Sequence, residues 1–466
     1  MTRDIFGAEQ LDALLQSVRD GAASFLRTIA HRPVAVAHAR LGAFAFPELP
    51  EKGWGAAPTL DYVRTNLEPL MSASPGPRYL GFVTGGATPA ALAGDWLVSA
   101  YDQNVSSDGD SIATSVERHA LALLRSLFGL PDAFEGAFVS GATQANLVAL
   151  ATARQWTYSR MGIDVAEKGL SGAPPIAVLA GAPHASVDKA LSVLGMGRGC
   201  IERIACIGER PAMDPAALEA RLAARAREGA PSIVSASAGE VNTGDFDDLR
   251  ALARVARRYD AWLHVDGAFG LFAAVDPARA RWLDGIEEAD SIASDAHKWL
   301  NVPYDSGFVF TRHLAAQERV FRTVAAYLGA GPDLLHRTPE NSRRFRALPA
   351  WMTLMAYGRE GYREMVQRCC AHAEQLGAHL AASESFDLLA EVRLNIVCFA
   401  LRSGDAADRT RLLDALHSGG HAFLTPTVYR GRPAIRAAFS NWSTTRDDVD
   451  TVARALEATL PARVTL

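Results

Sequence analysis

Seven short apolar segments of strand character recur between residues 137 and 308, and helical segments separate most of them. They are centred near residues 137, 176, 203, 233, 263, 291 and 308. Strands that alternate with helices are typical of a mostly parallel sheet that helices cover on both faces. A (β/α)8 barrel gives a similar alternation, but this chain becomes largely helical after residue 311. The pattern therefore predicts an open α/β sheet as the core of the fold.

The segments on either side of this sheet predict two smaller units. Residues 5–31 carry apolar side chains at helical spacing, and Pro33 follows them, so we expect an N-terminal helical arm over residues 1–74. Such an arm cannot bury its apolar face alone and must pack on the body of the protein or on a second subunit. After residue 370 the predicted helices and strands are mixed. We therefore expect a large α/β domain over residues 75–369 and a small C-terminal α+β domain over residues 370–466.

Composition restricts the class of partner. The 466 residues carry a formal net charge of −5, which does not favour nucleic acid or a membrane surface. No apolar run approaches the roughly 18 residues of a membrane span, and the first ten residues contain acids where a signal peptide needs an apolar core. The five cysteines have neither metal nor redox spacing. We expect a soluble cytoplasmic protein that has no metal site and acts on a small molecule.

A carboxylate and an amine follow two of the predicted strands. Asp266 ends the run 262–265, and Lys298 comes just after the run 291–293. Ligands of open α/β sheets bind at the carboxyl ends of the strands, so these two side chains suggest one shared site. Most lysines are solvated at the surface, but Lys298 lies between His297 and Trp299 and is therefore expected to be at least half-buried. A buried amine has a lowered pKa and can form a Schiff base with an aldehyde such as that of pyridoxal phosphate (PLP).

Two strand-to-helix turns supply further polar groups. Gly141, Ala142 and Thr143 lie where a predicted strand gives way to a helix. Small residues at a helix start let backbone N–H groups approach a phosphate, and the helix dipole favours the anion, although an ordinary N-cap has the same composition. The turn lacks the Gly-Lys-Ser/Thr ending of a nucleoside-triphosphate loop. His184 opens the next helix, where from the sequence alone a histidine is more often a cap or a core residue than a catalytic one.

Two segments of this chain carry a family resemblance. Residues 294–300, Ser-Asp-Ala-His-Lys-Trp-Leu, and residues 264–269, His-Val-Asp-Gly-Ala-Phe, closely resemble the group II PLP-dependent amino-acid decarboxylases, which include aromatic-L-amino-acid, tyrosine and glutamate decarboxylases. The resemblance covers roughly residues 75–450. It implies the aspartate aminotransferase-like fold of PLP-dependent transferases (fold type I) and a homodimer whose active site lies near the interface. The implied reaction is decarboxylation of an L-amino acid, with an aromatic substrate favoured.

The resemblance also implies a role for each matching residue. Lys298 would bind PLP as an imine, Asp266 would keep the pyridine nitrogen protonated, and His184 would stack on the ring and assist proton transfer. The other cofactor-binding positions are Ala142, Thr143, Ala268, Asp295 and His297. The substrate-binding positions are Tyr79, Phe82 and Arg436, with Trp351 as a further pocket wall. From the residues alone, a plain turn around Tyr79 and a salt-bridged strand around Arg436 are equally open.

Two positions near the expected site depart from the family pattern. Glu240 stands where many relatives have threonine, so the contact made by that threonine is in question. Asp295 stands where relatives often have asparagine, and an acid beside a phosphate is unfavourable unless it points away or bonds His297.

A third departure concerns the loop before residues 342–346. Relatives carry a tyrosine there that protonates the carbanion left by loss of CO2, and this loop has none. His336 is the nearest group able to carry a proton near neutral pH, and Tyr327 lies further upstream. Relatives without the tyrosine can release an aldehyde. Amine formation is the prediction, and an aldehyde synthase, a lyase, a transaminase and a non-catalytic member are the alternatives. Lys298, Asp266 and His184 together count against the last.

Overall fold

A seven-stranded sheet forms the centre of the computed structural model, which describes residues 8–323 and 333–460. Its strand order is β1-β7-β6-β5-β4-β2-β3. The strands are β1 (Glu135–Val139), β2 (Ala177–Ala180), β3 (Ile201–Arg203), β4 (Ser232–Ser237), β5 (Trp262–Asp266), β6 (Ser291–Asp295) and β7 (Gly307–Thr311). Strands β2 to β6 pair in parallel, and β7 is antiparallel to both β6 and β1. The mostly parallel sheet is confirmed, and each predicted strand centre lies in or next to one of these strands.

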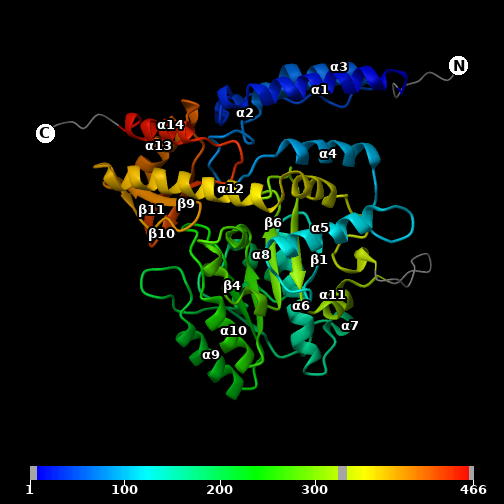
Figure 1. Cartoon of the computed structure of the whole chain (residues 1–466), viewed down its shortest axis with the longest axis vertical. Coiled ribbons are helices and arrows are strands. Elements are labelled where there is room, and N and C mark those ends of the chain that lie inside the picture. The colour runs from blue at the N-terminus through cyan, green and yellow to red at the C-terminus, as the bar shows by residue number, and fades with distance from the viewer. Residues whose placement is uncertain (1–7, 324–332, 461–466) are drawn as a thin grey trace.

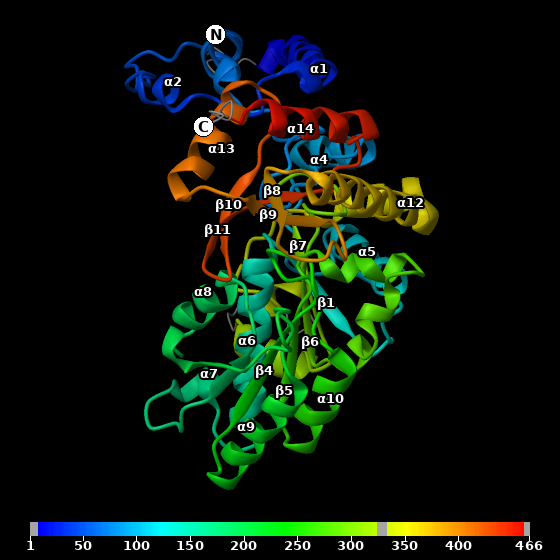
Figure 2. The same ribbon diagram turned by 90° about the vertical axis from the view of Figure 1, so that its left-hand side faces the viewer.

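Helices cover both faces of this sheet (Figures 1 and 2). Alternate residues of a strand point to opposite faces, so Ile233 packs in an apolar cluster with residues of α6, α7 and α8, while Val234 packs in the cluster that includes α5, α9, α10 and α12. The helices of this part are α4 (Pro89–Tyr101), α5 (Ala113–Leu127), α6 (Ala142–Ser159), α7 (Val165–Lys168), α8 (Ala185–Val193), α9 (Pro215–Arg227), α10 (Leu249–Arg258), α11 (Leu314–Phe321) and α12 (Ala347–Ala382).

A second, four-stranded antiparallel sheet lies in the C-terminal part, in the order β10-β11-β9-β8. Its strands are β8 (Phe386–Leu388), β9 (Ile396–Leu401), β10 (Thr425–Tyr429) and β11 (Arg432–Ala438), and its helices are α13 (Ala406–Ser418) and α14 (Arg446–Ala458). The long α12, interrupted at Gly358 where φ is 58°, runs past both sheets. The expected boundary at residue 370 falls inside this helix, so the two parts share one element there.

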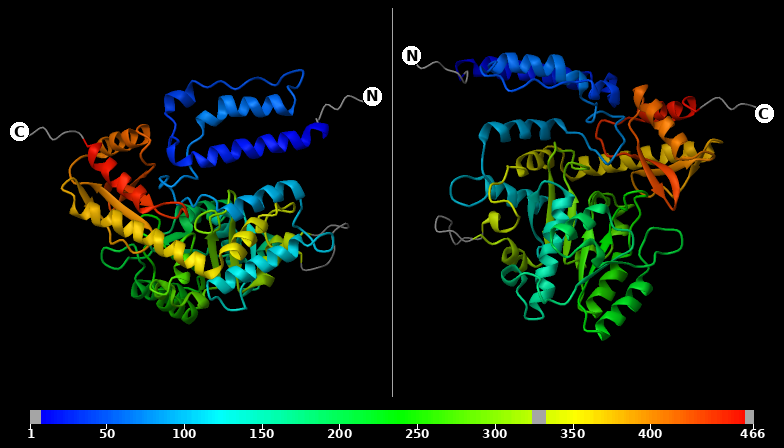
Figure 3. Two further views of the ribbon diagram at one scale, coloured as in Figure 1. Left: turned by 45° about the horizontal axis from the view of Figure 1, so that its top comes forward. Right: turned by 180° about the vertical axis from the view of Figure 1, so that it is seen from behind.

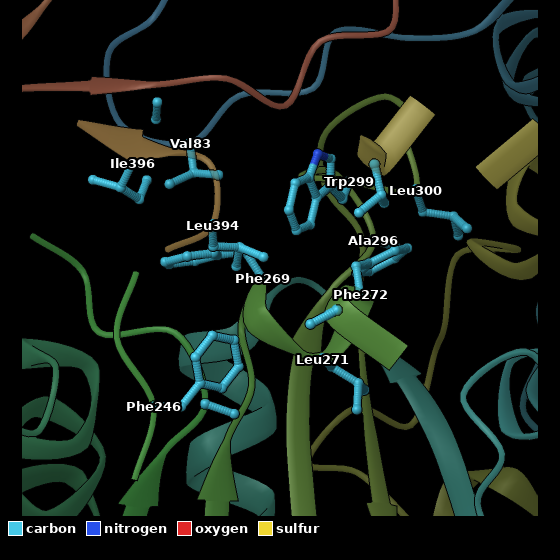
Figure 4. Close-up of a cluster of buried hydrophobic side chains, with 14 of the residues drawn as sticks. Val83, Phe246, Phe269, Leu271, Phe272, Ala296, Trp299, Leu300, Leu394 and Ile396 are labelled. Carbon is cyan, nitrogen blue, oxygen red and sulfur yellow. The ribbon is translucent and has the colours of Figure 1, made fainter. Parts of the chain in front are cut away.

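An apolar cluster joins the two parts (Figure 4). Phe272 lies after β5, and its ring centroid is 6.1 Å from that of Trp299, the residue after Lys298. Leu394 and Ile396 of the C-terminal part belong to the same cluster. Trp299 is completely buried. The turn that carries Lys298 is therefore anchored in the core on its far side.

The N-terminal arm forms a separate layer above α4 and α12 (Figures 1 and 3). Its helices are α1 (Leu11–Arg27), α2 (His38–Gly42) and α3 (Ala56–Tyr62), and none of them contains a buried residue. Figure 3 shows α1 and α3 side by side. Over residues 8–323 and 333–460, none of the helices combines the length and apolar character needed to cross a lipid bilayer.

Candidate active site

A cavity of about 300 Å³ lies where strands β1, β4, β5 and β6 end and helices α6 and α8 begin. This is the edge at which open α/β sheets bind ligands, and the volume suits a small molecule. All eight residues expected to bind the cofactor line it: Ala142, Thr143, His184, Asp266, Ala268, Asp295, His297 and Lys298. The structure thus brings together side chains that are up to 156 positions apart in the chain, from Ala142 to Lys298.

Lys298 is held by its neighbours at both its backbone and its amine. Its side chain is 19% exposed, and Nζ lies 2.8 Å from Asp295 Oδ2. Asn301 donates from Nδ2 to the carbonyl oxygens of Lys298 and Trp299, at 3.3 and 3.0 Å. At Gly85, a Cβ would lie only 1.8 Å from the Lys298 carbonyl oxygen, so only glycine permits this close approach. The amine is therefore presented to the cavity from a fixed turn.

Asp295 lies at the start of helix α6. Its Oδ1 accepts a hydrogen bond of 2.5 Å from the Ala142 N–H and lies 3.4 Å from His297 Nε2. Burial raises the pKa of the Asp295 carboxyl, but the positive charge of Lys298 and the ring of His297 outweigh this effect, and the net pKa is below its ordinary value. Burial lowers the pKa of His297, so its ring is neutral near pH 7. Of the two expected arrangements, the structure shows Asp295 in contact with His297, and it adds contacts with Ala142 and Lys298.

The turn into helix α6 has the properties of an anion site. Gly141 precedes the helix, and no side chain of its own caps the helix there. A Cβ on Gly141 would lie 3.1 Å from both Asp295 Oδ1 and His297 Cε1, and a Cβ on Gly307 would lie 2.5 Å from Gly141 Cα. The positive end of the helix dipole therefore faces the cavity, and apart from the Ala142 N–H, which donates to Asp295, it suits a phosphate group.

Asp266 ends strand β5, His184 precedes helix α8, and both line the cavity. Asp266 Oδ1 accepts from the Ala268 N–H at 3.1 Å, and Oδ2 accepts from Asn146 Nδ2 at 2.9 Å. His184 is the N-cap of α8, and its Nδ1 accepts from the Ser186 N–H at 3.2 Å. Burial lowers the pKa of His184, although the nearby charge of Asp266 acts in the opposite direction. The lowered pKa keeps the His184 ring neutral.

The three expected substrate-binding residues lie outside this lining. Arg436 donates to the carbonyl oxygen of Val241, which lines the cavity. It also donates to the carbonyl oxygen of Phe82, at 3.1 Å. Phe82 is 58% exposed. Tyr79 stacks on Phe423 with centroids 4.4 Å apart. Arg436 and Phe82 therefore lie beside the rim of the cavity, and Tyr79 does not line it.

Two other expected groups are also outside the lining. His336 is buried in the short 3₁₀ helix Leu334–His336, where its Nδ1 accepts from the Thr323 N–H at 3.2 Å. Within one chain the structure therefore does not bring His336 to the cavity, because its ring is turned into the protein. Trp351 donates to His119 of α5 at 3.0 Å instead of forming a pocket wall. Tyr327 lies outside the described residues.

Glu240 builds its own turn. Its carboxylate accepts hydrogen bonds from the N–H groups of Asn242 and Thr243, both at 3.0 Å, and from the side chains of the same two residues, both at 2.9 Å. Burial raises the pKa of Glu240 above its ordinary value. Asn242 in turn accepts from Thr427 of β10 at 2.7 Å. The acid at this position therefore fixes the loop against the C-terminal sheet.

Three polar residues of the site were not predicted: Ser186, which lines the cavity, and Asn146 and His264 behind it. Asn146 and His264 are completely buried, and Ser186 is 5% exposed. The signal that could have found them is a polar residue inside an apolar element, since Asn146 lies in Ala-Asn-Leu-Val-Ala-Leu and His264 in Trp-Leu-His-Val. A buried polar side chain needs partners, and here the partners are residues of the site.

The comparison with known families now decides the identity of this site. The pyridoxal-dependent decarboxylase conserved domain matches residues 47–402 of the chain. The chain belongs to this family. PLP is therefore the cofactor of this decarboxylase, a PLP-dependent carboxy-lyase that acts on an amino acid, and the predicted family, fold type I, cofactor and reaction are confirmed.

Individual relatives of this decarboxylase differ in substrate. It is 30% identical over 417 residues to an aromatic-L-amino-acid decarboxylase of Bacillus atrophaeus, a match that covers 86% of this chain and 85% of the relative. It is 31% identical over 425 residues to an L-2,4-diaminobutyrate decarboxylase of Rhizobium meliloti (strain 1021), covering 88% and 83%. The crystal structure of Oryza sativa TDC with PLP and tryptamine superposes with a TM-score of 0.88 at 26% identity, covering 97% of this chain and 98% of that one.

Proposed function

We propose that this decarboxylase converts an aromatic L-amino acid into its amine and CO2. The choice of substrate rests on one observation: each carboxylate that lines the cavity is already paired with another group of the protein. Among the described residues that line it, Asp266 bonds Asn146, Asp295 bonds Lys298, and Glu240 bonds its own turn. A cationic substrate side chain would find each carboxylate already engaged.

The rim of the cavity offers aromatic surface to such a substrate. Phe82 is mostly exposed beside Arg436, and Tyr304 is exposed with its ring centroid 4.4 Å from that of His297. The Tyr304 hydroxyl lies 3.3 Å from Thr84 Oγ1 in the same loop as Phe82. Uncharged aromatic side chains pack on such surfaces without requiring a charged partner. The names of the aromatic-L-amino-acid relative and of the tryptamine complex support the same choice.

We assign the cofactor contacts to the residues that line the cavity. PLP, when bound, supplies an electron sink that stabilises negative charge at the substrate Cα. Lys298 would bind it covalently through its amine, and Asp266 would face the pyridine nitrogen. Ala268 is small enough to let the ring lie flat, and His184 would cover the other face. The Thr143 N–H and His297 would hold the phosphate beside Ala142, whose own N–H donates to Asp295.

The remaining residues of the site hold protons and position the substrate. Asp295 Oδ2 lies 2.8 Å from Nζ of Lys298 and so positions this amine in the cavity. His184 accepts hydrogen bonds at Nδ1, so a neutral ring carries its proton on Nε2 and is the group we assign to proton transfer in this chain. Arg436 and Phe82 lie where they could bind the substrate carboxylate and side chain.

Aldehyde formation is the second candidate outcome. No tyrosine occurs between residue 328 and the Arg-Arg-Phe-Arg segment at 343–346. His336, the predicted substitute, faces the protein interior in its own chain. Both observations reduce the supply of protons to the substrate Cα, which favours a competing reaction with oxygen.

We further propose a cytoplasmic homodimer with the cavity near its interface. The exposed apolar side chains of α1, which include Leu11, Leu15 and Leu26, support a partner for the arm. The five cysteines all lie within the described residues and none is in a disulfide, which agrees with a reducing compartment.

Product analysis tests this function. Purified enzyme with PLP is incubated with tryptophan, tyrosine, phenylalanine, 2,4-diaminobutyrate and glutamate, and CO2, amine, aldehyde and hydrogen peroxide are measured. We expect one amine per CO2 from an aromatic substrate. A Lys298→Ala variant should lack both turnover and the cofactor absorbance that borohydride fixes to the wild-type protein. Turnover restricted to diaminobutyrate would refute the aromatic assignment, and stoichiometric aldehyde with peroxide would establish the second candidate.

A further inference from the structure

A continuous line of buried hydrogen bonds runs behind the cavity. Trp262 Nε1 lies 3.0 Å from Ser291 Oγ, and that oxygen lies 2.9 Å from His264 Nδ1. His264 Nε2 lies 2.9 Å from Asn146 Oδ1, and Asn146 Nδ2 lies 2.9 Å from Asp266 Oδ2. Trp262, Ser291, His264 and Asn146 are completely buried, so water does not compete for these groups. The line ends on the acid that we assign to the pyridine nitrogen.

The chemistry of the groups fixes the direction of every bond in this line. An ionised carboxylate only accepts, so the amide nitrogen of Asn146 must face Asp266, and its oxygen must accept from His264 Nε2–H. A neutral His264 then has a bare Nδ1, which accepts the Ser291 hydroxyl proton. The Ser291 oxygen accepts from Trp262, whose indole can only donate. All donors point toward Asp266, and no group is left with a mismatched partner.

A second branch leaves the same amide. Asn146 Nδ2 also lies 3.0 Å from Ser186 Oγ, and that oxygen lies 2.7 Å from His184 Nδ1. The second amide proton goes to Ser186, and the Ser186 hydroxyl proton goes to His184. His184 Nδ1 is thereby an acceptor, which places the ring proton on Nε2. One NH2 group thus bonds to Asp266 and, through Ser186, to His184.

We propose that Asn146 is a positioning residue that couples the acid at the pyridine nitrogen to the histidine at the ring face, with His264 fixing the orientation of its amide. This inference rests on the roles proposed above for Asp266 and His184. The hydrogen bond from Asn146 holds the Asp266 carboxylate in place and would keep it facing the pyridine nitrogen of bound PLP. Through Ser186, the same amide supports a second hydrogen bond to His184 Nδ1, which also accepts from the Ser186 N–H, and so strengthens the tautomer with its proton on Nε2. Loss of Asn146 would therefore affect cofactor binding and proton transfer together.

Replacement of the amide by a carboxyl group gives the most direct test. In Asn146→Asp, a protonated carboxyl can still donate to Asp266, whereas an ionised one repels it. The charged or titratable groups around this position are Asp266 and His264 of β5, His184 at α8, Asp295 at the end of β6, Lys298 after it, and Arg436 of β11. We expect the ratio of variant to wild-type PLP affinity to be at least tenfold lower at pH 9 than at pH 6.

The matched control is Asn395, another completely buried asparagine, which donates to the Phe439 carbonyl at 2.9 Å and does not line the cavity. For Asn395→Asp, the ratio of variant to wild-type PLP affinity should change by less than about threefold over the same pH range. Melting curves recorded without PLP establish that each variant is folded. A folded Asn146→Asp variant whose relative PLP affinity does not change with pH would overturn the proposal.

Two further variants separate the branches. Ser186→Ala breaks only the branch to His184, so kcat at saturating PLP should fall about tenfold while PLP affinity stays within about threefold. Asn146→Leu breaks both branches, and PLP affinity should fall about ten- to a hundredfold, the range for a hydrogen bond to a charged group. If Asn146→Leu binds PLP as wild type does, the coupling is absent.

Asp266→Asn distinguishes failure of this inference from failure of the proposed site. If Asp266→Asn leaves PLP affinity and the absorbance of bound PLP unchanged, the role assigned to Asp266 is wrong and the coupling has no target. If Asp266→Asn weakens PLP binding but the Asn146 variants do not, the site stands and only the role of Asn146 is refuted.

Discussion

His264 shows how a single buried side chain links the site to the stability of the protein. Its ring is completely buried, and burial lowers its pKa from 6.5 to about 4. Because the folded-state pKa is below the unfolded one, the unfolded chain binds more protons between these two values. The contribution of the neutral ring to stability is therefore fully present above pH 6.5 and is lost as the pH falls toward 4.

Replacement of this ring by a group that does not titrate should make stability less sensitive to acid. For His264→Gln we expect the slope of the unfolding free energy against pH, between pH 4.5 and 6, to be smaller than in wild type by about 1.4 kcal/mol per pH unit, the value for one proton. Urea unfolding at several pH values measures it. His31→Gln, at an exposed ring, should keep the wild-type slope. Equal slopes in wild type and His264→Gln would contradict the buried neutral ring.

At the scale of elements, the site depends on how closely helix α6 approaches strand β7. Gly141 begins the helix and Gly307 begins the strand, and a Cβ on Gly307 would lie 2.5 Å from Gly141 Cα. The atoms nearest to this Cβ are all backbone atoms of Gly141, so there is no flexible side chain that could move aside. The start of helix α6, which we assign to the phosphate, is positioned by this contact.

Gly307→Ala should therefore displace the start of α6. We expect PLP affinity to fall at least tenfold and the melting temperature to fall, since a backbone shift in a packed region costs about 1–3 kcal/mol. Fluorescence titration with PLP and thermal melts measure the two effects. Gly199→Ala, where a Cβ would meet nothing within 4 Å, serves as the control and should leave both unchanged. Wild-type PLP affinity in Gly307→Ala would show that this contact does not shape the site.

At the scale of the whole molecule, the N-terminal arm leaves apolar surface uncovered. Helix α1 has no buried residue, and Leu11 and Leu15 are more than half exposed. Side chains of this kind, arranged along one helix, are typical of a surface that another subunit covers. The arm lies in a layer of its own above α4 and α12 (Figure 1).

A charged arm should therefore prevent dimer formation. Wild-type protein is expected to have twice the chain mass of 49.8 kDa in light scattering, and the double variant Leu11→Glu/Leu15→Glu is expected to be largely monomeric at micromolar concentration. Its turnover should fall if the cavity lies near the interface. Val193→Glu, at an exposed apolar residue at the end of α8, should keep the wild-type mass. An unchanged mass in the double variant would refute the assignment of the arm to the dimer.

Local sequence was sufficient for most elements of the large sheet. Each strand there is a short apolar run between helical segments. Strands β8 and β10 were missed. β8 has three residues, and β10 contains a proline, so both depend on pairing with β9 and β11 and carry no pattern of their own.

The sequence by itself determined the family, the cofactor and the eight residues around Lys298 that line one cavity, because their types and spacing are tied to strand ends and helix starts. Only the tertiary structure decided the rest. In the folded chain, His336 is buried outside the cavity and Glu240 is hydrogen-bonded within its own loop. Asn146 of α6 is hydrogen-bonded to His264 of β5 and to Ser186 of α8. Hydrogen bonds between distant elements depend on orientation and distance in the folded chain, and a linear sequence specifies neither.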